Sequence, residues 1–110
     1  MERSLDFSPV DIVDKPYEII DEPKLLSDDG DHGKTISARC LIKVDMDQHP
    51  SQLRDTIWHE LLHGMWFEGG LSQIVSEDEK EEMCVRVLAT LSLYCLRKNP
   101  KLVKFLLAKD

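Results

Sequence analysis

Residues 51–70 read SQLRDTIWHELLHGMWFEGG. This stretch determines the fold, because the rest of the chain is expected to pack against the element that it forms. Its apolar side chains recur at the three- and four-residue spacing of a helix with one buried face. They are Leu53, Ile57, Trp58, Leu61, Leu62 and Met65. Ser51 is a suitable N-cap and Gly69-Gly70 a suitable stop. The sequence therefore predicts an amphipathic helix from Gln52 to Phe67.

The same helix carries a His-Glu-x-x-His pattern, made by His59, Glu60 and His63. Residues four apart lie one above the other on a helix, so both imidazoles point the same way and can bind one zinc ion. The metal would lower the pKa of a bound water to about 7, and Glu60 would take its proton and pass it to a leaving amine. We therefore interpret His59 and His63 as metal ligands and Glu60 as a catalytic residue.

The surroundings of the pattern favour this interpretation over coincidence. The motif alone can arise by chance, and two exposed histidines on a helix are common. Here the histidines lie beside Gln52 and Thr56, away from the apolar side, so they are expected to line a cleft rather than fill the core. An acidic helix also follows at a suitable distance, which adds a source of further ligands.

The segment before this helix predicts a small sheet. Residues 1–16 are polar and contain two prolines, so an irregular arm is expected there. A short strand at Tyr17–Ile20 and a loop over residues 21–33 follow. The runs Lys34–Arg39 and Leu41–Val44 predict either a tight hairpin or one bent strand.

The segment after it predicts two more helices. Glu77, Asp78 and Glu79 suit the positive amino end of a helix that starts near Ser76 and continues through Leu96. Pro100 opens a last short helix that reaches about Ala108. Together with the strands, these helices predict a single α+β domain over residues 1–110.

Composition and charge restrict the classes of partner and compartment. A chain of 110 residues is one small domain by length, and its formal net charge of −7 repels phosphate backbones, so no nucleic-acid partner is expected. Three cysteines without a Cys-x-x-Cys pair argue against a disulfide framework and a thiolate zinc cluster. No signal-like amino end and no run long enough to span a bilayer are found, which predicts a cytoplasmic protein without a membrane partner.

A third metal ligand is needed, because catalytic zinc sites usually have three from the protein. The candidates for this third ligand are Glu77, Asp78, Glu81, Glu82, Cys84, His32 and His49. On the acidic helix, Glu81 groups with Cys84 and Leu88, whereas Glu82 groups with Val85 and Ala89. Periodicity slightly favours Glu81, which lies nearer the centre of the apolar stripe.

The chain also resembles a known family. His59-Glu60-Leu61-Leu62-His63-Gly64, followed by Glu82-Met83-Cys84-Val85 and Leu88-Ala89, is similar to the minimal gluzincins of the ImmA/IrrE type. The resemblance covers roughly residues 17–107, but only its HExxH part is specific. Within the family, the chain most resembles the small HELLH-containing proteins that phages and prophages encode. The third ligand of that family is the glutamate of a Glu-x-x-Ala pattern, so the resemblance implies Glu82, with Val85 in place of the alanine.

This resemblance implies a zincin-like fold and a zinc metallopeptidase activity. A small curved sheet would pack on the active-site helix, and an edge strand, for which Leu41–Val44 is our candidate, would hold a peptide by strand addition. The substrate would be a protein or peptide and, by analogy with the family, a regulatory protein. The alternatives are a non-catalytic zinc-containing binding module that acts through a protein partner, and a zinc hydrolase for a non-peptide substrate. A domain of this size has few walls for a pocket, so a partner chain or a dimer is a further way to complete the cleft.

Overall fold

The computed structural model describes residues 3–71 and 78–108 and shows a mixed β-sheet packed against a long helix, as the predicted α+β class requires. Strand β3 (Lys15–Asp21) pairs antiparallel with β1 (Arg3–Ser4) and β2 (Val10–Ile12). Strand β3 pairs in parallel with β5 (Leu41–Val44), and β5 pairs antiparallel with β4 (Gly33–Ile36). The strand order in the sheet is therefore β1-β3-β5-β4, and β2 also pairs with β3.

Strands β4 and β5 form a hairpin, which is one of the two arrangements that the sequence left open. The 3-10 turn η1 (Ser37–Arg39) joins them, and Cys40 closes the turn with a positive φ of 51°. Because β5 is hydrogen-bonded to a strand on each side, our prediction that Leu41–Val44 is the edge strand is wrong. The strand at this edge of the sheet is β4, and β1 lies at the opposite end of the strand order.

The prediction of an irregular arm over residues 1–16 is also wrong for the described part of that segment. Val10 and Ile12 are fully buried in β2, and two residues with positive φ, Val13 and Asp14, turn the chain into β3. The Asp11 carboxylate accepts the Asp14 N–H at 2.7 Å and so supports a turn that lacks glycine. The expected loop over residues 21–33 contains the short helix α1 (Leu25–Asp29), which ends at Gly30 with a φ of 75°.

In the described part of the chain, three α-helices follow the sheet strands. Helix α2 (Pro50–Glu68) contains the predicted helix and ends, as expected, at Gly69-Gly70. Its N-cap is His49 rather than the predicted Ser51, because Pro50 occupies the first turn, where a missing N–H costs nothing. Helix α3 (Asp78–Lys98) and helix α4 (Pro100–Leu106) agree with the two later helices, although the expected start at Ser76 lies outside the described residues.

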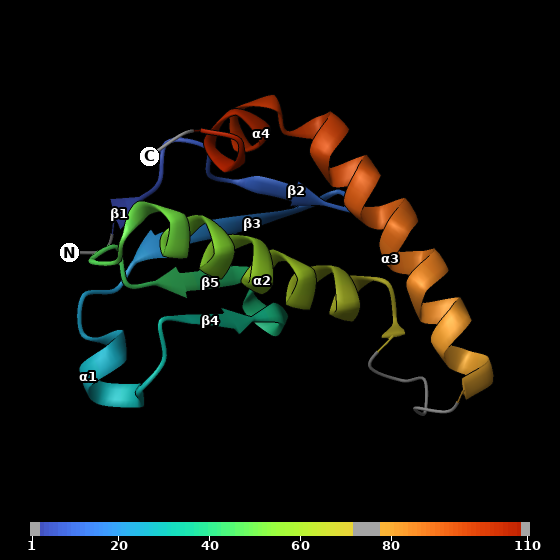
Figure 1. Ribbon diagram of the computed structural model, residues 1–110, viewed down its shortest axis with the longest axis horizontal. Coiled ribbons are helices and arrows are strands. Elements are labelled where there is room, and N and C mark those ends of the chain that lie inside the picture. The colour runs from blue at the N-terminus through green and yellow to red at the C-terminus, as the bar shows by residue number, and fades with distance from the viewer. Residues whose placement is uncertain (1–2, 72–77, 109–110) are drawn as a thin grey trace.

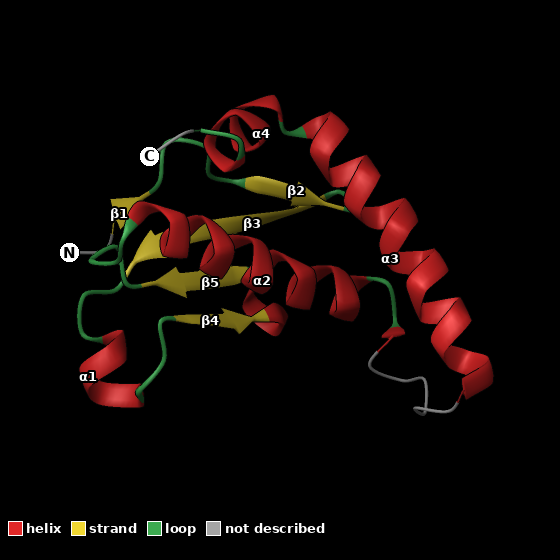
Figure 2. Ribbon diagram, in the orientation of Figure 1, coloured by secondary structure: helices red, strands yellow, loops and turns green. Residues whose placement is uncertain are grey.

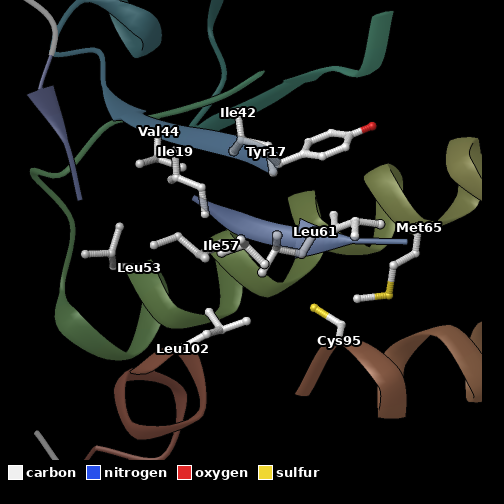
Figure 3. Close-up of a cluster of buried hydrophobic side chains, with 12 residues drawn as sticks. Tyr17, Ile19, Ile42, Val44, Leu53, Ile57, Leu61, Met65, Cys95 and Leu102 are labelled. Carbon is white, nitrogen blue, oxygen red and sulfur yellow. The ribbon is translucent and has the colours of Figure 1, made fainter. Parts of the chain in front are cut away.

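The core fills the space between the sheet and α2 (Figure 3). Tyr17, Ile19, Ile42 and Val44 come from the sheet and meet the apolar side chains of α2; those are Leu53, Ile57, Leu61 and Met65. Cys95 from α3 and Leu102 from α4 close the core on another side. The side of α2 opposite these core residues carries the exposed His59 and His63.

The later helices lie on one side of α2, and β4 lies on the other (Figures 1 and 2). Helix α3 meets the carboxyl end of α2, where a Cβ built on Gly69 would lie 2.9 Å from Leu91 Cδ1 and 3.0 Å from Val87 Cγ1. Helix α4 then returns beside α2. No helix within residues 3–71 and 78–108 is long and apolar enough to cross a lipid bilayer.

Candidate metal centre

The two histidines of the motif lie together on the exposed side of α2. The Nε2 atoms of His59 and His63 are 3.2 Å apart, and the rings meet edge to face with their centroids 4.8 Å apart. Both side chains are exposed. The expectation that one helical turn aligns the two imidazoles is therefore met.

The distance between the two nitrogens suits a shared ion. Two nitrogens bound at 2.0–2.1 Å to one tetrahedral zinc lie roughly 3.1–3.4 Å apart, depending on the angle at the metal. The 3.2 Å separation falls in that range, and both atoms are the Nε2 of their rings. Without an ion the same spacing permits one ring N–H to donate to the other ring's lone pair. The spacing is therefore compatible with a shared cation and with a hydrogen bond between the two rings.

Glu60 is buried, whereas the two histidines of the motif are exposed. Only 7% of it is exposed, since it lies about 60° around the helix from His63, on the flank of α2 that faces β4. Its Oε1 accepts a hydrogen bond from the Thr35 hydroxyl at 2.7 Å. The carboxylate thus lies between the helix and the edge strand rather than in open solvent.

The edge strand presents backbone groups beside Glu60. The Asp45 N–H donates to the His32 carbonyl at 3.0 Å, which marks a hydrogen-bonded pair just before β4. Hydrogen-bonded and non-hydrogen-bonded pairs alternate along antiparallel strands. The backbone N–H and C=O groups of Lys34 and Ile36 therefore bond to β5, whereas those of Gly33 and Thr35 point away from β5. Within residues 3–71 and 78–108 no strand pairs with this edge of β4, so it is available for pairing with another strand.

The other candidate ligands are not brought to the histidine pair by the described structure. Glu82 lies in α3, but its side chain, like that of Glu81, is outside the part that the structure describes, and Glu77 lies outside it altogether. His49 caps α2 about 15 Å of helix away from His59, and its Nδ1 accepts the Ser51 N–H. Among the described side chains, no group of three His, Cys, Asp or Glu residues could hold a metal ion.

Neither of two hollows in the described part of the surface is lined by His59 or His63. The larger, of about 1070 Å³, lies between residues 5–7 and α4, far along the chain from the motif. The smaller, of about 460 Å³, lies between α2 and α4 and is lined in part by Trp58, the residue before His59. We give the histidine pair more weight than either hollow, because it alone combines donor atoms with a metal-ligand spacing. Both histidines lie on an exposed part of the surface, so neither hollow is the cleft that we expected them to line.

Sequence reasoning missed Gly33 and Thr35 as residues of this centre. Their alternate positions in a strand place them on one face. Nothing in the sequence indicates that this face meets Glu60, because that contact depends on the pairing of β4 with β5 and on how α2 crosses the hairpin.

Comparisons with known proteins do not identify a relative. No family model, no curated protein and no solved structure matches the chain. The interpretation of the centre therefore depends on its own residues.

Proposed function

We propose that the chain is a zinc-dependent metallopeptidase of the ImmA/IrrE-like kind, acting in the cytoplasm on a protein or peptide. His59 and His63 are its metal ligands, Glu82 is the third ligand, and Glu60 is the catalytic residue. The observation that supports this most strongly is the 3.2 Å separation of the two Nε2 atoms, which suits a shared zinc ion.

The neighbours of the pair fit the proposed chemistry. A zinc ion held there would polarise the scissile carbonyl and a water molecule. Glu60, beside the pair on α2, accepts a proton from that water as the water oxygen bonds to the carbonyl carbon. Glu60 then gives the proton to the amine nitrogen as the C–N bond breaks, which leaves a free acid and a free amine.

The free edge of β4 supports a peptide as the substrate. An extended chain can pair with the outward backbone groups of Gly33 and Thr35, and this edge adjoins the flank of α2 that carries Glu60. A peptide bound in this way lies next to the motif. A substrate without a peptide backbone gains nothing from such an edge.

Hydrolysis of a peptide library by the zinc-loaded protein, followed by mass spectrometry, tests this proposal. We expect cleavage that a chelator stops and added zinc restores. Glu60→Gln should keep the zinc and lower the rate by at least about 100-fold, because the proton acceptor is lost. Glu18→Gln, an exposed carboxylate change in β3, should leave the rate unchanged.

The alternative function, a zinc-containing binding module, predicts a different outcome. Such a module contains zinc, cleaves nothing, and binds its protein partner equally well after Glu60→Gln. A zinc-loaded wild-type protein that leaves the whole library intact would contradict the peptidase proposal, as would a Glu60→Gln variant with the wild-type rate.

A further inference from the structure

The buried carboxylate of Glu60 has a specific hydrogen-bond donor on the neighbouring strand. A buried carboxylate is unfavourable unless polar groups satisfy it. The Thr35 hydroxyl lies 2.7 Å from Glu60 Oε1 and 3.0 Å from the Glu60 carbonyl oxygen. It has one proton and so donates to one of them at a time. The bond to the charged oxygen is the shorter, and hydrogen bonds to ionised groups are the stronger kind.

The backbone of β4 also approaches Glu60 unusually closely. A Cβ built on Gly33 would lie 2.9 Å from Glu60 Cγ and 3.1 Å from Glu60 Oε2. The Thr56 Cγ2 atom would lie 2.8 Å from the same Cβ, so any side chain at position 33 would displace Glu60, Thr56 or the strand. Gly33 and Thr35 lie two residues apart on β4 and so face α2 together. The glycine leaves room for the carboxylate, and the threonine fixes one of its oxygens.

We propose that Thr35 is a positioning residue for Glu60. Its hydroxyl holds Oε1 and leaves Oε2 to accept the proton of the attacking water. Thr35 keeps its own proton throughout, so it acts only through the orientation of the carboxylate. The catalytic part of this inference rests on the proposed peptidase function, whereas the orientation of Glu60 does not.

Two variants of Thr35 separate the hydroxyl from the shape of the side chain. Thr35→Val keeps the branched shape and removes the donor, and Thr35→Ser keeps the donor. We expect Thr35→Val to lower kcat by about 10- to 100-fold, because small displacements of a reacting group have effects of this size. KM and zinc content should stay within about twofold, and Thr35→Ser should retain most of the wild-type kcat.

Thr56→Val is the matched control. The Thr56 hydroxyl donates to Gln48 Oε1 at 3.0 Å, and no bond from it to Glu60 is found among the described contacts. This change also removes a hydrogen-bonded hydroxyl beside β4, but it should leave kcat at the wild-type value. An equal loss of kcat in Thr56→Val and Thr35→Val would mean that the effect is merely structural and would overturn the inference.

A second measurement does not need any hydrolysis. Three-bond NMR couplings about the Cα–Cβ and Cβ–Cγ bonds report whether the Glu60 side chain, which carries the carboxylate, keeps one χ1–χ2 rotamer or averages over several. We expect a single rotamer in the wild-type protein and in Thr35→Ser, and averaging in Thr35→Val. Unchanged couplings in Thr35→Val would show the inference to be wrong, whatever the activity. A wild-type protein that hydrolyses nothing but shows the expected couplings would instead refute the peptidase function and leave the role of Thr35 in place.

Discussion

At the scale of residues, the centre combines two exposed histidines with a buried glutamate on the same helix. His59 and His63 project from the outer side of α2, while Glu60 turns toward β4 and bonds to Thr35. This difference follows from helical geometry, since a step of one residue turns the side chain by about 100°. The imidazoles therefore stay open to a metal ion, and the carboxylate is held between two elements.

The sequence was informative about this centre to different degrees for different residues. The pairing of His59 with His63 depends only on a four-residue spacing within one helix, and the structure confirms it. The partner of Glu60 depends on tertiary packing, which no spacing reveals. The choice of Glu82 over Glu81 concerns side chains outside the described part of the chain, so it stays a prediction.

A buried thiol gives the first stability prediction. Burial raises the pKa of Cys95 to about 11, whereas a free thiol has a pKa of about 8.5. A group with a raised pKa in the folded state stabilises the fold below its unfolded pKa, and this contribution is lost as the pH rises through the folded pKa. The free energy of unfolding should therefore fall between pH 9 and 11, with a slope of up to about 1.4 kcal/mol per pH unit.

Urea unfolding of the wild-type protein and Cys95→Ala at several pH values measures this contribution. The variant should be less stable at pH 8, because it leaves a cavity. Its deficit should shrink as the pH approaches 11, since it has no thiol to ionise at this position. A deficit that is constant with pH would show that the ionisation of Cys95 is not linked to folding.

At the scale of elements, the junction between α3 and α4 is tied to the sheet by one side chain. Asn99 Oδ1 accepts the Asp11 N–H at 3.1 Å, and Asn99 Nδ2 donates to the carbonyls of Asp11 and Cys95 at 3.2 and 2.7 Å. These bonds join β2 to the two helices across 88 residues of sequence. Asn99 therefore does more than break the helix before Pro100.

Removing this side chain should destabilise the fold without affecting the metal centre. We expect Asn99→Ala to lower the free energy of unfolding by about 1–3 kcal/mol, because it leaves partly buried backbone groups without partners. Chemical denaturation measures the loss. Ser92→Ala on α3, which removes only a local bond to the Ala89 carbonyl, is the control and should cost less. An Asn99→Ala protein as stable as this control would contradict the structural role.

The predictions of helices and strands were accurate where the sequence of one segment determines the element. They failed where the element depends on which other strands or helices it packs against. Periodicity and glycines predicted α2 and its end, because its buried face is contiguous in sequence. Strand β2 was missed, since three residues carry too short a pattern and their turn, Val13-Asp14, lacks the usual glycine or asparagine. The edge strand was misassigned because the order of strands in a sheet is a tertiary property.

At the scale of the whole molecule, none of the described elements covers the face of α2 that carries the motif histidines. The sheet and the apolar side of α2 form the core, α3 and α4 cover one flank of α2, and β4 covers the other (Figure 1). His59 and His63 occupy the exposed strip between these flanks. A bound ion would therefore be reached from outside by an extended chain that follows β4.

The zinc content of protein purified without added metal tests the central claim most directly. Because two imidazole nitrogens 3.2 Å apart can share an ion, elemental analysis should find about one zinc per chain in the wild-type protein and almost none in His63→Ala. His49→Ala, which changes a histidine at the start of the same helix, should keep its zinc. A wild-type protein that binds no zinc, or a His63→Ala variant that retains it, would contradict the account.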